Sequence, residues 1–381
     1  MGILIVDDNQ VNLFVVENLL KRAGYKDYKS FLSAQEMFDY LQVDNPIPVE
    51  RSVDIILMDI MMPEMDGIEA CRQLQKIPHL KDIPVIFVTA LEDSDKVVEA
   101  LDAGGTDYVM KPINKTELLA RIRVALRLKY EKDWHLKQEE KIRNQLELSM
   151  KVQTSLLSEP INTSSLFMKA SYLPAYKLAG DMYYWHKIDD DRYAVILLDM
   201  MGHGISASLV CMFISSVLRD SIRTCPDPEY VICELNRWMN SLNQRTENIP
   251  YYFTTIYMVI DTKNKSIEYI NAGHPSGYAL TEDNELIELS TCTCAVGMFE
   301  RIDCQKSIIT YKDKIQLILY TDGVQETLEH MDIDALNYIK QKSSDFWDIH
   351  TSCEPLDFIL SKENQKAAED DMCMVFIQAT S

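Results

Sequence analysis

Residues 54–59 read DIILMD, an apolar run with an aspartate at each end. A similar run, ILIVDD, occupies residues 3–8, and residues 85–89 (VIFVT) and 108–112 (YVMKP) repeat the pattern of an apolar run followed by a polar residue. Segments with helical periodicity separate the runs. Uniformly apolar strands that alternate with helices are typical of a parallel sheet covered on both faces. The sequence therefore predicts a doubly wound (βα)5 α/β domain over residues 1–125.

Polar residues follow the apolar runs at the carboxyl ends of the predicted strands, where such sheets bind ligands. They are Asp7, Asp8, Asp59, Thr89 and Lys111. A lone aspartate after a strand is often only a helix cap. Three carboxylates at one edge need a cation, and a hard divalent ion such as Mg²⁺ suits oxygen ligands. The set predicts a phosphoryl-transfer centre in which Asp59 attacks phosphorus while Lys111 and Thr89 hold the product oxygens.

The same residues carry a family resemblance. Residues 5–8 (IVDD), 58–67 (MDIMMPEMDG), 88–90 (VTA) and 108–112 (YVMKP) resemble the motifs of the CheY-like receiver domains of bacterial response regulators. The resemblance implies that a partner histidine kinase phosphorylates Asp59.

The receiver resemblance also implies particular roles for individual residues. Asp8, Asp59 and the backbone carbonyl of Met61 would bind Mg²⁺, with help from Asp7. Thr89 and Tyr108 would be the coupled switch residues. The Lys111–Pro112 peptide bond would be cis, which is uncommon even before proline.

Residues 116–157 contain neither Gly nor Pro and mix charges of both signs with regularly spaced apolar residues. We therefore expect a helical linker over residues 126–158. Two interpretations stay open: a solvated extension of the last receiver helix, or a coiled coil that makes the protein a homodimer.

The sequence becomes rich in strands after Pro160. Strands are expected near residues 166–173, 182–187, 192–198, 251–260, 266–271, 305–310, 315–320 and 372–378. Helices are expected after Gly204 and after Pro228, and over residues 331–362. Hairpin-like spacing with helices grouped apart predicts an α+β layered β-sandwich domain over residues 159–381.

Acidic residues again stand at strand ends in this second domain. They are Asp181, Asp199, Asp322 and Asp370. Turn formation beside glycine explains any one of them, but explains all four less well. Separated carboxylates with few histidines indicate Mg²⁺ or Mn²⁺ rather than zinc. Two such ions bridged by water would generate hydroxide at neutral pH.

These residues also resemble a family. Residues 179–181 (AGD), 199–204 (DMMGHG), 271–275 (NAGHP), 320–323 (YTDG) and 370–372 (DDM) are similar to the motifs of PPM-type metal-dependent serine/threonine phosphatases, in the SpoIIE/RsbU branch of bacteria. The similarity extends from about residue 150 to the last residue. It implies direct attack of a bridging hydroxide on phosphorus, without a covalent phosphoenzyme.

By this resemblance Asp199 bridges two Mn²⁺ or Mg²⁺ ions. The carbonyl of Met200, together with Asp322 and Asp370, would complete the metal site, and Asp181 would hold metal-bound water.

Four further residues of this domain bear on the resemblance. His203 and His274 could be general acids or make structural hydrogen bonds. The sequence departs from the family pattern at Tyr184, where an acid is usual, and at Cys373, where threonine is usual. The first departure puts an auxiliary metal contact in question, but no principal ligand is missing.

Other readings of the glycine-rich loop fit less well. Residues 202–207 (GHGISA) match a dinucleotide-binding pattern, but Asp199 would repel pyrophosphate and repeated βαβ units are missing here. Ser206 does not lie in the G-x-S-x-G pattern of serine hydrolases.

Composition limits the remaining function classes. The chain has 381 residues and a formal net charge of −21, which argues against nucleic acid as a partner. No apolar run approaches the ~20 residues of a membrane span and no leader opens the sequence, so we expect a cytoplasmic protein with no membrane partner. Nine scattered cysteines without a CxxC pair fit reduced thiols.

The sequence therefore predicts a signalling enzyme. Phosphorylation of Asp59 would control hydrolysis of phosphoserine or phosphothreonine on a protein, with a STAS-domain anti-anti-sigma factor of a stress or developmental sigma-factor pathway as the substrate implied by the resemblance. The alternative is a phosphorylation-gated binding scaffold without turnover. A DNA-binding regulator would need a basic output module, which the sequence does not show.

Overall fold

The computed structural model describes residues 2–43, 53–90, 94–244, 250–343, 354–366 and 368–380. The chain divides into two compact units, Met1–Ile142 and Arg143–Ser381, which are described separately below.

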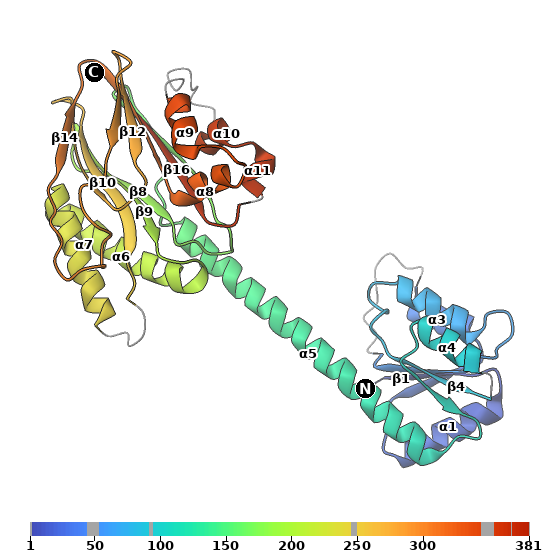
Figure 1. Cartoon of the computed structure of the whole chain (residues 1–381). Coiled ribbons are helices and arrows are strands. Elements are labelled where there is room, and N and C mark those ends of the chain that lie inside the picture. Colours follow the sequence, from blue (N-terminus) through green and yellow to red (C-terminus); the bar gives the residue numbers. More distant parts are fainter. Residues whose placement is uncertain are drawn as a thin grey trace. The chain divides into compact units, whose positions relative to one another are not determined.

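The first unit is a five-stranded parallel sheet with helices on both faces (Figure 1). Its strands are β1 (Ile3–Val6), β2 (Tyr28–Phe31), β3 (Ile55–Met58), β4 (Val85–Thr89) and β5 (Asp107–Met110), in the order β2-β1-β3-β4-β5. Its helices are α1 (Gln10–Arg22), α2 (Ala34–Leu41), α3 (Gly67–Lys76), α4 (Ser94–Asp102) and the first part of α5 (Lys115–Thr154).

Alternation along each strand explains why both faces of this sheet are covered. In β1, Leu4 and Val6 pack with residues of α2 and α3, whereas Ile3 and Ile5 pack with residues of α1 and α5. Side chains of a strand point alternately to the two faces, so an uninterrupted apolar strand serves two cores. The structure thus confirms the predicted doubly wound parallel sheet.

Helix α5 is 40 residues long and has no break, as the lack of Gly and Pro predicts. Leu118, Ile122 and Ala125 are buried in the first unit. Further along, Gln153 is buried in the second unit, where its side-chain amide donates to the Ala179 carbonyl at 2.6 Å. Between these ends the helix carries exposed apolar side chains, at Leu128, Trp134, Leu136, Ile142 and Leu148.

The second unit contains two antiparallel sheets (Figure 1). Strands β8 (Met182–Lys187), β9 (Arg192–Met200), β10 (Phe253–Asp261), β11 (Ser266–Ala272) and β14 (Ser307–Thr310) form the first sheet, in the order β14-β11-β10-β9-β8. The second sheet has the order β13-β12-β15-β16-β7-β6 and consists of β6 (Ile161–Asn162), β7 (Leu166–Leu173), β12 (Gly277–Thr281), β13 (Leu286–Leu289), β15 (Lys314–Tyr320) and β16 (Met372–Thr380).

Helices cover the outer faces of both sheets. Helices α6 (Gly204–Thr224) and α7 (Pro228–Asn243) pack on the first sheet, and α8 (Asp322–Glu329), α9 (Ala335–Ser343) and α10 (Pro355–Ile359) pack on the second, with α11 (Lys362–Lys366) following α10. Leu197 and Val375 lie in the core between the sheets, whereas Ile196 and Met374 face the helices. The unit is therefore a four-layer α-β-β-α sandwich, which confirms the predicted α+β class.

The structure corrects two expectations about helices. The predicted helical region 331–362 consists of α9 and α10, with residues 344–353 outside the described part, and α8 already begins at Asp322. Helix α6 is also long and apolar enough to cross a membrane by length and composition, contrary to the expectation that no run approaches that length. Half of its most apolar window is buried against the first sheet, as in a core helix.

Candidate functional site

Two aspartates and a lysine meet at the carboxyl edge of the parallel sheet. Asp7 follows β1, Asp59 follows β3 and Lys111 follows β5. The Lys111 Nζ lies 2.8 Å from Asp7 Oδ2 and 2.7 Å from Asp59 Oδ2. Both carboxylates are buried. The parallel sheet thus brings residues more than a hundred positions apart into one ion-pair network.

The electrostatics of this network suit a cation. Burial raises the pKa of Asp59 above its usual range, and the hydrogen bond from Lys111 only partly offsets that effect. Burial disfavours the charge of Lys111, but hydrogen bonds to Asp59 and Asp7 outweigh it and raise the lysine pKa. Asp8 is exposed beside them, and carboxylate oxygens of Asp7, Asp8 and Asp59 lie within 4.8 Å of one another. This donor set fits a hard divalent ion.

The other predicted receiver residues lie on neighbouring strands and in the segment that follows Asp59. Thr89 ends β4 and is fully buried, and Tyr108 lies half-buried in β5 with the Arg121 guanidinium 5.6 Å from its ring. The backbone N–H of Met61 donates to Asp59 Oδ1 at 3.4 Å. The Lys111–Pro112 bond is cis, as the resemblance implied.

Four acids converge in the second unit. Asp181 precedes β8, Asp199 is the penultimate residue of β9, Asp322 opens α8 and Asp370 precedes β16. Burial raises the pKa of Asp199 to about 8, and the charges of Asp322 and Asp370 add to the shift. Burial and the charge of Asp199 also raise the pKa of Asp181 well above its usual value. These carboxylates are close enough to repel one another, although they come from both sheets.

The buried hydroxyl of Thr321 and a fifth aspartate, Asp371, hold this cluster in place. The Thr321 hydroxyl donates to Asp181 Oδ2 at 2.7 Å, and the Cys373 N–H donates to the Thr321 Oγ1 at 2.9 Å. Asp371 is 3% exposed, and its carboxylate accepts the N–H groups of Ala175 at 2.8 Å and Gly180 at 2.7 Å. Sequence reasoning singled out neither Thr321 nor Asp371 as a site residue.

Glycines allow the segments of the cluster to approach one another. Gly202 and Gly204, in the turn after Asp199, have φ values of 80° and 77°, where a side chain would be strained. A Cβ at Gly323 would overlap the backbone carbonyl of Asp371. The turn and the first residues of α8 therefore require glycine for the cluster to close.

The residues outside the main cluster have distinct surroundings. His274 is buried and its Nδ1 lies 2.8 Å from the Thr254 hydroxyl, whereas His203 is exposed and stacks on Tyr176 with ring centroids 4.6 Å apart. Tyr184 lies under the guanidinium of Arg219, at 4.7 Å, on the α6 side of the sheet. The structure thus provides an aromatic contact for Tyr184, and Cys373 is fully buried.

The second cluster fits divalent ions by its donor chemistry. Asp181, Asp199, Asp322 and Asp370 supply only oxygens. Burial, and after it the charges of neighbouring carboxylates, raise the pKa values of Asp181, Asp199 and Asp322, and a cation would neutralise those charges. Among the described residues, only the Asp7, Asp8 and Asp59 group has three acidic ligand atoms all within 4.8 Å of one another. The second cluster is more widely spread, which suits more than one ion.

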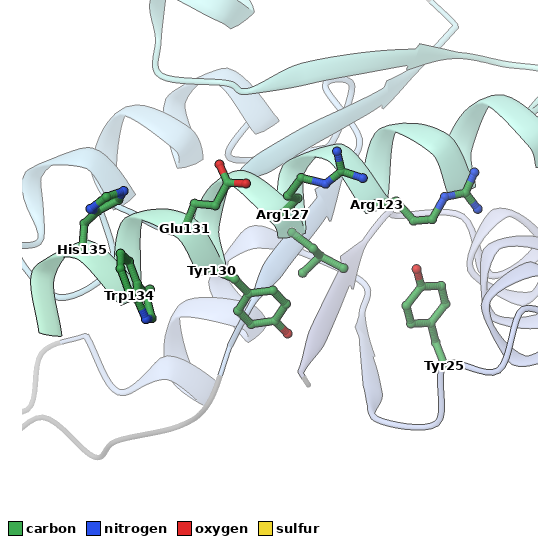
Figure 2. Close-up of a pocket in the computed structure, with 8 residues that line it drawn as sticks. Tyr25, Arg123, Arg127, Tyr130, Glu131, Trp134 and His135 are labelled. Atoms are coloured by element: carbon green, nitrogen blue, oxygen red, sulfur yellow. The ribbon is translucent and has the colours of Figure 1, made fainter. Parts of the chain in front are cut away.

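A groove of about 800 Å³ lies elsewhere, on the first unit (Figure 2). Tyr25 forms one side, and Arg123, Arg127, Tyr130 and Trp134 of α5 line it. None of the described residues that line it belongs to either acidic cluster. The groove is therefore separate from both predicted metal sites.

Comparison with known proteins identifies the family of each unit. Residues 189–380, just over half of the chain, match the family model of Stage II sporulation protein E (SpoIIE). The chain belongs to the SpoIIE family. Residues 3–123 match the response regulator receiver domain, so this SpoIIE-family chain carries a receiver before its sandwich domain. The SpoIIE match includes Asp199, Asp322 and Asp370, while Asp181 lies just before it.

Individual relatives match parts of this SpoIIE-family chain. Phosphoserine phosphatase RsbP of Bacillus subtilis is 35% identical over 240 residues, which are 62% of this chain and 58% of RsbP. Transcriptional regulatory protein SpaR of Bacillus subtilis is 35% identical over 125 residues, which are 33% of this chain and 51% of SpaR. The chain thus spans less than two thirds of these relatives.

A solved structure is similar to part of this chain. The PP2C phosphatase domain of SpoIIE from Bacillus subtilis, solved with a fragment of its regulatory domain, is 20% identical with a TM-score of 0.47. The match covers 57% of this chain and 64% of that one.

Proposed function

We propose that the protein is a response-regulator phosphatase that hydrolyses phosphoserine or phosphothreonine on a protein substrate. The observation that carries the proposal is the convergence of Asp181, Asp199, Asp322 and Asp370 in a domain of the SpoIIE family. The 35% identity with a phosphoserine phosphatase over 240 residues supports the same chemistry.

The chain's own residues define a mechanism. Asp199, the Met200 carbonyl, Asp322 and Asp370 would hold two Mn²⁺ or Mg²⁺ ions, which supply an activated water and neutralise charge on the transferring phosphoryl group. Asp181, fixed by the Thr321 hydroxyl, would orient that water. The Ala175 and Gly180 N–H groups hold Asp371 and thereby position the residue next to it, Asp370.

The proposed receiver function places a phosphoryl group on Asp59. A histidine kinase would be the phosphodonor, and Mg²⁺ would be held by Asp7, Asp8, Asp59 and the Met61 carbonyl. Lys111 would then exchange its ion pair with Asp59 for one with the phosphoryl oxygens, and Thr89 and Tyr108 would adjust with it. A phosphoryl group on Asp59 stabilises whichever receiver conformation it fits better. If that conformation favours one arrangement of α5, phosphorylation would change the turnover of the phosphatase domain.

The substrate is proposed by analogy with the family. A STAS-domain anti-anti-sigma factor phosphorylated on serine or threonine would be dephosphorylated, and so freed to act in a stress or developmental sigma-factor pathway. Homodimerisation through α5 is part of this proposal.

Phosphate release tests the enzyme directly. The wild type should hydrolyse a phosphorylated STAS-domain protein and a small aryl phosphate in the presence of Mn²⁺. Asp199→Ala should lose both activities, because it removes the carboxylate proposed to bridge the ions. Equal turnover by the two proteins would end the phosphatase proposal.

The regulatory part has its own test. Beryllium fluoride, which mimics the phosphoryl group, should raise turnover of the wild type, and Asp59→Ala should not respond. An equal response by the mutant would show that the receiver is not the switch.

A further inference from the structure

An uncharged rim adjoins the acidic cluster of the second unit. We define this rim as the side chains of Tyr176, His203, Ile205 and Leu209. Tyr176 is 55% exposed and stacks on His203, while Ile205 and Leu209 are 56% and 60% exposed on successive turns of α6. Such large apolar side chains gathered at one place on a surface indicate an interaction site.

The rim is attached to the cluster at both ends. The Ala175 N–H donates to Asp371, which places Tyr176 next to the acids, and Tyr176 stacks on His203 of the turn that follows Asp199. Ile205 follows the Asp199–Gly204 turn directly. The rim is therefore continuous with the segments that carry the acidic cluster.

Helix α6 keeps this surface free of charge. Its sequence, GISASLVCMFISSVLRDSIRT, has no charged residue before Arg219. Ala207, Cys211 and Ile214 face the core, but Ile205 and Leu209 face outward and contribute nothing to that core. In a chain with a net charge of −21, the exposed side of these four turns of helix therefore carries no charge.

We propose that the rim is the docking surface for the protein substrate, which contacts it through exposed apolar side chains that flank the phosphorylated residue. The inference rests on the proposed phosphatase function. A phosphoserine is short, so its phosphoryl group reaches the acidic cluster only when the substrate's own surface lies against the residues around that cluster. Ions held by the cluster would bind the phosphoryl group, which every phosphorylated substrate shares, so selection of one protein substrate needs contacts outside the cluster. Burial of apolar side chains can supply them.

The test compares a protein substrate with a small one. The double variant Ile205→Gln/Leu209→Gln keeps side chains that favour helix but removes the apolar contact. We expect its kcat/KM for a STAS-domain protein phosphorylated on serine to fall by about tenfold or more, as for loss of central interface residues. Its kcat/KM for p-nitrophenyl phosphate should stay within about twofold, since that ligand contacts only the cluster.

Leu336→Gln provides the matched control. Leu336 is 48% exposed on α9, which packs on the other sheet of the sandwich, so this change should leave both activities as in the wild type. Thermal unfolding of all three proteins shows whether the changes disturb the fold.

The possible results separate two failures. If the double variant and the wild type have equal kcat/KM values for the phosphoprotein, the docking proposal is wrong but the phosphatase proposal stands. The docking proposal is also wrong if the double variant loses equal factors of kcat/KM for the phosphoprotein and for p-nitrophenyl phosphate. A change from dimer to monomer in sedimentation would assign the rim to a second copy of this chain and also overturn it. If the wild type hydrolyses neither substrate, the phosphatase proposal fails. In that case, binding of the phosphoprotein is measured for the wild type and the double variant. Weaker binding by the double variant would support the rim as the contact, and equal binding would overturn it.

Discussion

His274, a buried residue of the sandwich domain, has its protonation state set by burial. Burial lowers the pKa of His274 to about 3, so the ring is neutral in the folded protein at ordinary pH. An unfolded histidine titrates near pH 6.5. The stabilising contribution of His274 is therefore complete above that value and is lost as the pH falls below it, because the unfolded chain gains a proton that the folded state excludes.

His274→Asn tests this sign. The asparagine amide can replace Nδ1 as the partner of the Thr254 hydroxyl without titrating. Between pH 7.5 and pH 5 the wild type should lose about 2 kcal/mol more unfolding free energy than the variant, as measured by urea unfolding at each pH. Carboxylates titrate alike in both proteins and cancel in the difference. Parallel pH profiles would show that His274 is accessible to protons.

The sequence was enough to predict the acidic residues at the ends of strands. It did not predict Thr321 and Asp371, the residues that fix the positions of those acids. Asp370 and Asp371 are adjacent, and the sequence did not reveal that Asp371 is the one tied to two backbone N–H groups. The Thr321 hydroxyl lies 140 positions from its partner Asp181, a pairing that only the packing of the two sheets creates. The proposed ligand roles of the predicted acids remain predictions.

At the level of elements, each unit has a helix that packs a glycine of its first turn against an acidic segment. A Cβ at Gly323 in α8 would overlap the Asp371 carbonyl, and a Cβ at Gly67 in α3 would overlap the Asp59 carbonyl. Gly323→Ala should therefore displace the start of β16, lower the unfolding free energy by about 1–3 kcal/mol and raise the Mn²⁺ concentration needed for aryl phosphate turnover by about tenfold or more.

Gly67→Ala serves as the paired control for that change. It should disturb Asp59 and weaken the response to beryllium fluoride, while basal aryl phosphate turnover and its Mn²⁺ requirement stay as in the wild type. If Gly323→Ala binds Mn²⁺ normally, α8 does not control the position of Asp370.

Apolar runs predicted the strands well because each is buried on at least one face. The predicted strands 166–173 and 182–187 agree with β7 and β8 at both ends. The strands β2, β6, β12 and β13 were missed. Strand β2 reads YKSF and lies at a sheet edge, where exposure removes the apolar pattern. Strand β13 reads LIEL and also lies at a sheet edge, with two half-buried residues and one exposed residue among its four.

At the scale of the whole molecule, the proposed regulation depends on α5, the helix whose two ends are buried in different units. Its middle exposes Leu128 and Ile142, each by 55% of its surface, and no described contact covers them. Apolar side chains on an otherwise charged helix are stable in water when a second helix covers them. A second copy of α5 would do so.

Ile142→Glu tests whether α5 pairs. Two glutamates facing each other across a dimer repel and are desolvated, so the variant should sediment as one chain where the wild type sediments as two. It should also lose its response to beryllium fluoride, while hydrolysis of p-nitrophenyl phosphate in Mn²⁺ persists because Ile142 is not part of either cluster. Leu336→Glu, an equally drastic change on α9, should alter neither mass nor response. A wild type that sediments as one chain with and without beryllium fluoride would rule out pairing of α5, and the signal from Asp59 would then have to travel within a single chain.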